Sequence, residues 1–194
     1  MRKILTRASA LCLFVCVTAY AKYPAPPQQY SLVNVSSGQT QHIYRDGNRA
    51  LIDLYMPKGP NQPVAIHTRT IVDVASKTNL TWDLLDSKVP CDSPGQGDWG
   101  DPFGYWDQSV QGMPGKLKQT GKDTVNGMKT TVFEISSPEG TAKLWREDKY
   151  GLLVKNTVTP KGGAQMEMFE IRDFKIGKPS ASVFVVPARC KWKK

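Results

Sequence analysis

Hydrophobic and polar residues alternate along most of the chain after residue 29, and short turn sequences separate the alternating stretches. A period of two residues is typical of β-strands with one buried face. The strands expected on this basis cover residues 30–35, 40–44, 49–56, 66–74, 78–84, 116–124, 129–136, 142–147, 152–159 and 164–176. Because connections this short join only antiparallel neighbours, the sequence predicts a mainly β fold, an antiparallel meander with few short helices.

The last of these strands, residues 164–176, does not keep a single alternation. Its hydrophobic residues change parity twice, from Met166 and Met168 to Phe169 and Ile171, and then to Phe174 and Ile176. One flat face does not allow this pattern. Two explanations fit: a β-bulge that shifts the alternation, or a strongly curved sheet that meets apolar partners on both faces.

Residues 86–115 interrupt the strand pattern, because Gly, Pro and Asp crowd this segment. One or two helical turns are expected within residues 103–113. Four aromatic residues fall close together in the segment: Trp99, Phe103, Tyr105 and Trp106. A loop with so much apolar surface either folds back onto the core or covers a ligand cavity.

The aromatic residues of this segment, together with Met166 and Met168, are the predicted ligand-binding residues. Methionine side chains are flexible and polarisable, and they suit irregular apolar ligands. Ordinary core packing is the alternative interpretation of the same residues.

The first 21 residues have the features of a cleavable export signal. Basic residues stand near the start, residues 11–17 are apolar, and the small residues Ala19 and Ala21 precede Lys22. The apolar run is too short to span a bilayer, which needs roughly 20 residues. We expect a Pro-rich leader at residues 22–29, as an extended tether, and one β-rich domain at residues 30–194. The predicted location is therefore periplasmic or extracellular.

The charge of the chain does not indicate a nucleic-acid partner. Removing the signal takes away three of the 26 basic residues and none of the 17 acidic ones, so the net charge falls from +9 to about +6. No basic stripe interleaved with aromatic residues is present. The main basic cluster is Arg189, Lys191, Lys193 and Lys194. We interpret it as a solvated tail that favours peripheral contact with anionic lipid surfaces.

Two cysteines follow the signal, Cys91 and Cys190. In an oxidising compartment an even pair usually forms a disulfide. Closing a loop of roughly 100 residues contributes about 4 to 5 kcal/mol in the chain-entropy account. A metal site would need further ligands at short spacing, and the sequence places none beside either cysteine.

The sequence holds no catalytic constellation. Its two histidines, His42 and His67, lie inside predicted strands, and no GxSxG element supplies a nucleophile. Asp98, Asp101 and Asp107 could offer oxygen ligands to Ca²⁺, but their spacing matches no EF-hand. Asp is also common in turns. We therefore expect no enzyme activity, no metal and no cofactor.

Several short motifs carry a resemblance to a known family. Residues 43–49 (IYRDGNR) open one alternating hairpin, and residues 121–130 (GKDTVNGMKT) form a strand and turn. Residues 144–154 (LWREDKYGLLV) form a second hairpin, and IGKP at 176–179 with FVVP at 184–187 closes the pattern. Together these motifs resemble the superfamily of periplasmic lipoprotein carriers of the Lol type and their uncharacterised exported relatives. The chain differs from the carriers in having a Pro-rich leader in place of an N-terminal amphipathic helix. Arg146 and Leu153 also depart from the family pattern.

The resemblance implies a curved antiparallel sheet, an open half-barrel, with helices on its concave side. It transfers no functional residue to this chain. The expected function is a non-enzymatic envelope protein that binds a lipid, an acyl chain or an acylated protein in the concave face. The alternatives are a structural or protein-interaction module without a cavity, and an exported hydrolase whose carboxylates the sequence does not pair.

Overall fold

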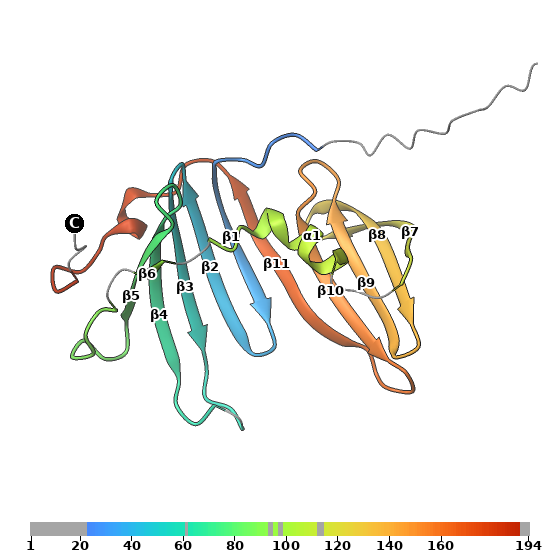
Figure 1. Ribbon diagram of the computed structural model, residues 1–194, viewed down its shortest axis with the longest axis horizontal. Coiled ribbons are helices and arrows are strands. Elements are labelled where there is room, and N and C mark those ends of the chain that lie inside the picture. The colour runs from blue at the N-terminus through green and yellow to red at the C-terminus, as the bar shows by residue number, and fades with distance from the viewer. Residues whose placement is uncertain (1–22, 61, 93–94, 97–98, 112–114, 191–194) are drawn as a thin grey trace, which may run out of the picture.

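The strands of this protein form where hydrophobic and polar residues alternate, as the sequence predicts. The computed structural model describes residues 23–60, 62–92, 95–96, 99–111 and 115–190 (Figure 1). The predicted export signal, residues 1–21, lies outside the described residues. Among the residues that the structure describes, no helix is long and apolar enough to cross a membrane.

One antiparallel sheet contains all the described strands. These are β1 (Gln29–Ser36), β2 (Gln39–Asp46), β3 (Arg49–Met56), β4 (Ile66–Asp73), β5 (Thr78–Asp83), β6 (Gly95–Gln96), β7 (Leu117–Val125), β8 (Met128–Ser137), β9 (Gly140–Glu147), β10 (Leu153–Pro160) and β11 (Met166–Ile176). The helical elements are η1 (Pro102–Gly104), α1 (Tyr105–Gln111) and η2 (Ala181–Phe184). The two-residue strand β6 is the one strand that the alternation does not predict.

The sheet is open, and its strand order is β6-β5-β4-β3-β2-β1-β11-β10-β9-β8-β7. Consecutive strands are neighbours within each half, as a meander requires. At the centre, however, β1 pairs with β11, so the first and last strands join two meanders. The connection from β6 to β7 must therefore pass from one edge of the sheet to the other, and it carries η1 and α1 (Figure 1).

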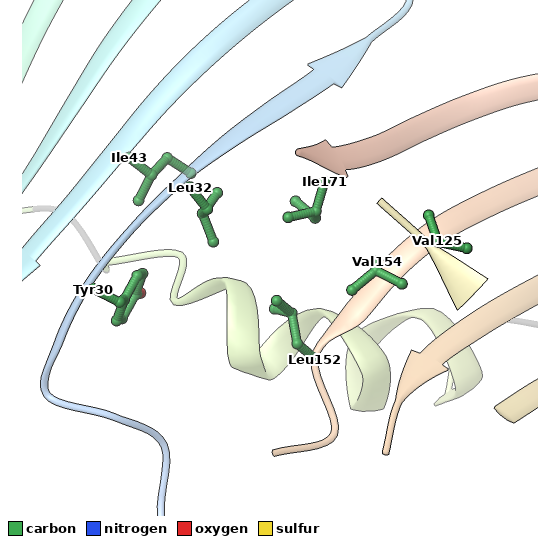
Figure 2. Packing of buried hydrophobic residues seen from close by; sticks show 7 residues of the cluster. All are labelled: Tyr30, Leu32, Ile43, Val125, Leu152, Val154 and Ile171. Atoms are coloured by element: carbon green, nitrogen blue, oxygen red, sulfur yellow. The ribbon is translucent and has the colours of Figure 1, made fainter. Parts of the chain in front are cut away.

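Each face of the sheet has its own apolar cluster, because successive residues of a strand point to opposite faces. Ile43 belongs to a cluster with Tyr30, Leu32 and Ile171 (Figure 2). Trp99 and Phe103 pack against this cluster. We call this side the helix face. The next residue, Tyr44, packs against a second cluster on the opposite face, formed by buried residues of three strands and the C-terminal segment: Leu51, Ile71, Leu80, Trp82, Phe184 and Cys190.

Two register shifts explain the parity changes in β11. Phe169 pairs with Asn156 and Glu167 with Thr157, which leaves Met168 as an extra residue. Opposite β1, the register shifts again where Asp173 takes a positive φ of 50°. The strand therefore contains bulges, and the sheet also has apolar partners on both faces. The β-bulge explanation is therefore confirmed, whereas on the opposite face β11 itself carries the charged residues Glu170 and Arg172.

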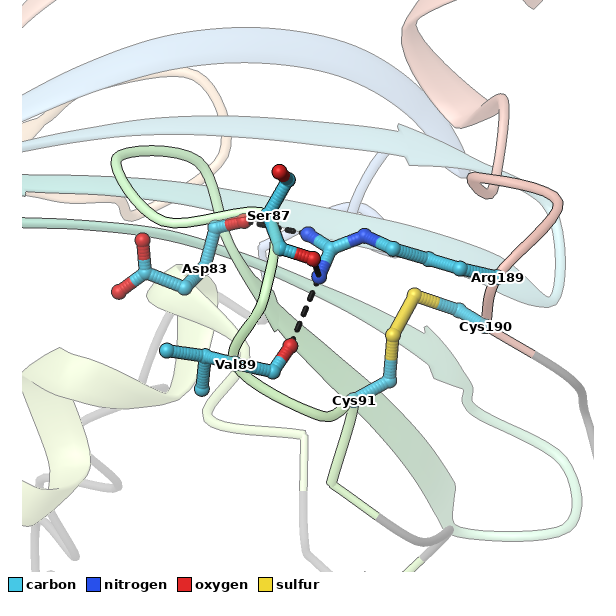
Figure 3. Close-up of a disulfide and its surroundings, with 6 residues drawn as sticks. All are labelled: Asp83, Ser87, Val89, Cys91, Arg189 and Cys190. Carbon is cyan, nitrogen blue, oxygen red and sulfur yellow. Dashed lines mark hydrogen bonds between the residues drawn. A yellow bond between two sulfur atoms is a disulfide. The ribbon is translucent and has the colours of Figure 1, made fainter.

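The predicted disulfide between Cys91 and Cys190 is present, and it ties the loop after β5 to the C-terminal segment (Figure 3). The two Cα atoms are 5.4 Å apart, across a sequence separation of 99 residues. Beside it, Arg189 donates hydrogen bonds to the carbonyl oxygens of Ser87, Val89 and Asp83 at 2.6, 2.7 and 2.8 Å. Arg189 is thus part of the fold and not of a solvated tail. The other members of the predicted basic cluster, Lys191, Lys193 and Lys194, lie outside the described residues.

The described part of the Pro-rich leader lies against the domain. Tyr23 packs on Gly151, whose φ is 77°, and a Cβ at that position would stand 3.0 Å from the tyrosine ring. The guanidinium of Arg146 lies 4.9 Å from the centre of the same ring. The backbone carbonyl of Gln28 accepts a hydrogen bond from the backbone N–H of Gly47. These contacts hold Tyr23 and Gln28, the two ends of the described leader, against the sheet.

Candidate functional site

The aromatic segment between β6 and β7 is held on the helix face by a polar network around Asp101. The Asp101 carboxylate caps η1 by accepting a hydrogen bond from the Phe103 N–H at 3.0 Å. It also accepts from the Tyr30 hydroxyl at 3.3 Å and lies 3.6 Å from the Arg45 guanidinium. Burial raises the pKa of Tyr30 above its usual range, and the charge of Asp101 raises it further. The hydroxyl therefore stays protonated and remains a donor.

Trp99 and Phe103, two of the predicted ligand-binding residues, pack at the centre of the sheet. The Phe103 ring lies edge-on to Tyr30, with 5.3 Å between centroids, and 6.1 Å from Phe174. Trp99 packs against the same cluster, with the Arg45 guanidinium 5.8 Å from its ring. Edge-to-face pairs at such distances are each worth about 0.5 to 1.5 kcal/mol beyond area burial. Both residues therefore stabilise the contact between the segment and strands β1 and β11.

Tyr105 and Trp106 lie further along the segment, over strands β8 to β11. The Trp106 ring packs edge-on to Phe133 at 4.9 Å, and Tyr105 faces Phe169 at 6.4 Å. Arg146 completes this contact, because its guanidinium lies 4.3 Å from the Trp106 ring and 4.6 Å from Phe133. All four aromatic residues of the segment thus pack back onto the sheet, which is the core-packing alternative. A further role in ligand binding stays a prediction.

Beyond α1, an apolar strip on the helix face is left partly open. Its members occupy one cross-strand row, with one residue from each of β7 to β11, and residues in one such row share a face. The row is Leu117, Ile135, Ala142, Val158 and Met166. We call these five residues the apolar strip. Its ends are exposed, with Met166 at 49% and Leu117 at 38% of their full accessible surface.

The middle of the apolar strip is hollowed into a shallow groove of about 360 Å³. Its lining includes Ile135, Ala142 and Val158, which we call the floor, and Pro160 and Glu139, which we call the rim. This volume is near the lower end of the roughly 300 to 1,000 Å³ typical of ligand pockets. Of the predicted ligand-binding residues, Met166 belongs to this strip. Met168, at the β11 bulge, is 39% exposed.

The opposite face of the sheet carries a polar network that the sequence analysis did not predict. Partial burial on its own raises the pKa of the Glu170 carboxyl, but hydrogen bonds from Asn126, Lys155 and Arg172 lower it to about 2. The Lys155 ammonium lies 2.9 Å from one Glu170 oxygen and 2.6 Å from Glu167. These residues come from β10, β11 and the turn between β7 and β8, so no single local pattern in the sequence joins them.

The histidines also have partners that their positions in the sequence do not suggest. His67 Nε2 lies 2.7 Å from the Asp53 carboxylate, whose other oxygen accepts from Arg69 Nε at 2.7 Å. His42 stands directly across from Asp53 in the strand register. Within the part of the chain that the structure describes, no group of three or more His, Cys, Asp or Glu side chains could hold a metal ion. Asp98, one of the three carboxylates considered for Ca²⁺, lies outside the described residues.

Comparisons with known proteins identify a shared fold and no family. The chain matches no protein-family model and no curated protein sequence. A solved structure of an uncharacterized conserved protein from Thermus thermophilus aligns with a TM-score of 0.50 and 8% identity, over 84% of this chain and 87% of that one. At this identity the likeness concerns the fold alone. The resemblance to Lol-type carriers therefore stays a prediction.

MucB in its complex with MucA from Pseudomonas aeruginosa aligns less closely. Its TM-score is 0.42 and its identity 14%, over 86% of this chain. The present chain spans 59% of that chain, and 57% of MucB in its complex with MucA(peri), where the TM-score is 0.39. Similarity this low supports no inference about function.

Proposed function

We propose that the chain is an exported, non-enzymatic protein that binds an apolar ligand, such as a lipid or an acyl chain, on the helix face. The observation that carries this proposal is the groove in the apolar strip, beside which the strip ends in the exposed apolar residues Leu117 and Met166. Adjacent strands lie about 4.8 Å apart, so a row crossing five strands spans about 19 Å. An acyl chain laid along it would gain about 0.8 kcal/mol for each buried CH₂.

Export is part of the proposal. The disulfide between Cys91 and Cys190 supports it, because such bonds persist in oxidising compartments and are rare in the cytosol. The basic and apolar pattern of residues 1–21 is in keeping with the same compartment.

In this proposal, the aromatic segment acts as a fixed wall of the site. Tyr105 and Trp106 pack on Phe169 and Phe133, which lie three and two residues from the apolar strip on their own strands. The segment therefore keeps water from one side of the strip. The Asp101 network holds that wall in place without covering the groove.

The apolar strip allows a direct test, because each of its five residues carries a methyl group. We expect methyl dodecanoate, titrated into the mature chain, to shift the methyl NMR signals of Ile135, Ala142 and Val158. Val158→Asp places a charge on the floor of the groove and should weaken binding at least tenfold. The control, Ile176→Asp, also replaces an apolar residue by a charged one, but at the C-terminal end of β11, away from the groove. Ile176 is 52% exposed, and this variant should leave binding intact.

Two results would contradict the proposal. One is the absence of methyl shifts at the apolar strip, and the other is an equal loss of binding in Val158→Asp and Ile176→Asp. Folding of each variant is checked by its urea midpoint.

A protein-interaction module is the second candidate function. Leu117 lies in β7, and among the described strands β7 has a neighbour on one side only. The apolar strip thus runs to an edge where a partner strand could add to the sheet. A chain that ignores acyl compounds but loses partner binding in Leu117→Asp would support this candidate.

A further inference from the structure

One polar side chain interrupts the apolar surface next to the groove. Asn156 stands two residues before Val158 on β10, on the same face, and pairs across the sheet with Leu144 and Phe169. It is only 8% exposed. Its Oδ1 atom is buried and has no hydrogen-bond partner among the residues that the structure describes.

Such an amide is costly to the fold. Leaving a buried acceptor unpaired destabilises the folded state, whereas an apolar residue of the same shape is nearly neutral or stabilising. Buried polar groups in native proteins nearly always have a partner, so each exception points to a missing one. The side chains of Leu144 and Phe169, which flank Asn156 in the register, cannot donate a hydrogen bond.

The position of Asn156 suits a ligand in the groove. Two residues along a strand correspond to about 6.6 Å, so the amide lies one short step from the floor at Val158. The partner must be a donor, since a carbonyl oxygen only accepts.

The rim of the groove adds a constraint on charge. Glu139 lines it together with the neutral residues Ser137 and Thr141. A carboxylate ligand would be repelled by Glu139 and would offer Asn156 no proton. A neutral head group with an N–H or O–H avoids both problems.

We infer that the groove binds a neutral acyl compound whose head group carries a hydrogen-bond donor, and that Asn156 accepts this hydrogen bond. The inference rests on the proposed function and adds the chemical class of the ligand. It makes Asn156 a specificity-determining residue, because it distinguishes donor-bearing acyl compounds from esters of the same length.

The test compares dodecanamide, which donates, with methyl dodecanoate, which does not. Dissociation constants come from titrations of the mature chain followed by the methyl signals of the apolar strip. We expect the amide to bind about tenfold more tightly than the ester, as one satisfied buried polar group implies. In Asn156→Leu this ratio should fall to about one, while the affinity for the ester stays the same or improves.

Asn34→Leu is the matched control. Asn34 is also 8% exposed and also has a buried Oδ1 without a partner among the described residues, but it lies across β11 from the groove. This variant should keep the tenfold ratio. Asn156→Ser retains an acceptor and should keep part of the tenfold ratio. It provides a second test in case Asn156→Leu does not fold.

The outcomes separate the two proposals. Equal affinities in the wild-type chain, or a ratio that Asn156→Leu leaves unchanged, overturn the inference. If both compounds then still bind and Val158→Asp weakens both, the proposed function stands without it. If neither compound binds the wild-type chain, the proposed function and the inference fail together.

Discussion

At the scale of single residues, several side chains act through partners that are distant in the sequence. Arg146 is an example, because its guanidinium joins Tyr23 of the leader, Trp106 of α1 and Phe133 of β8. A cation over an aromatic ring contributes about 0.5 to 1 kcal/mol at exposed sites and more when desolvated. In the sequence, Arg146 is a departure from the carrier pattern. Its role as a contact between three segments follows from the fold.

Glu170 predicts how stability depends on pH. Its folded-state pKa is about 2, below the ordinary 4.5, so its contribution is present above pH 4.5 and is lost as the pH falls toward 2. A shift of this size corresponds to on the order of 2 to 3 kcal/mol. We expect urea unfolding of the wild-type chain to show this loss between pH 6 and pH 2.5. Glu170→Gln should be less stable at pH 6 and should vary less over the same range.

Glu134→Gln is the control for this pH dependence, since the half-buried Glu134 side chain accepts one long hydrogen bond, 3.5 Å from the Ser136 hydroxyl. An equally flat pH profile for both variants would contradict the assignment to Glu170.

At the scale of elements, the local pattern of the sequence was enough to predict most strands. It was not enough to predict pairing between strands that are far apart in the chain. The strands from β1 to β5 and from β7 to β11 follow the alternation of their own residues, and short turns fix their neighbours. The pairing of β1 with β11 depends on residues far apart in the chain, such as Val33 and Arg172, and no period in the sequence encodes it. The parity changes in β11 did signal its bulges, because each bulge shifts the alternation by one residue.

The second bulge of β11 gives a prediction for backbone conformation. Asp173 has a φ of 50°, a region that Gly and, to a lesser degree, Asp tolerate and β-branched residues avoid. We expect Asp173→Val to lower the free energy of unfolding by about 1 to 3 kcal/mol, and Asp173→Gly to leave it nearly unchanged. Urea unfolding measures both.

Lys175→Val is the control for the bulge variants. Lys175 is exposed on the same strand and pairs in register with Ser31. If this substitution is as costly as Asp173→Val, the loss reflects valine on this strand and not the positive φ.

At the scale of the whole molecule, the candidate site could be predicted only in part. Met166 was identified from its residue type and lies in the apolar strip. The other members of the strip come from four other strands, and only the register of the sheet shows that they form one row. They are Leu117, Ile135, Ala142 and Val158. The aromatic segment was recognised as apolar, but the sequence left open whether it packs or covers a ligand. The structure places it on the sheet because the connection between the two edges has to cross that face.

The disulfide makes a prediction for the molecule as a whole. The C-terminal segment supplies Phe184 to the cluster on the opposite face, and the Cys91–Cys190 bond holds that segment in place. We expect the double variant Cys91→Ser, Cys190→Ser to lose about 2 to 5 kcal/mol of stability. Hydrogen exchange should rise in β4 and β5, which the segment covers.

The reduced wild-type chain should behave like the double variant. The same treatment should leave exchange in β8 and β9 nearly unchanged, since these strands lie in the other half of the sheet. Uniform loss of protection across both halves would contradict this assignment.

The central pairing of β1 with β11 also has a consequence for how the chain is made. The edge of β1 that faces away from β2 stays unpaired until β11 has been synthesised, because its partner is β11. Contacts between such distant segments form slowly, and an open strand edge is a template for pairing with other chains. The newly made chain is therefore exposed to aggregation along this edge of β1, and the period of greatest risk ends when β11 pairs with it.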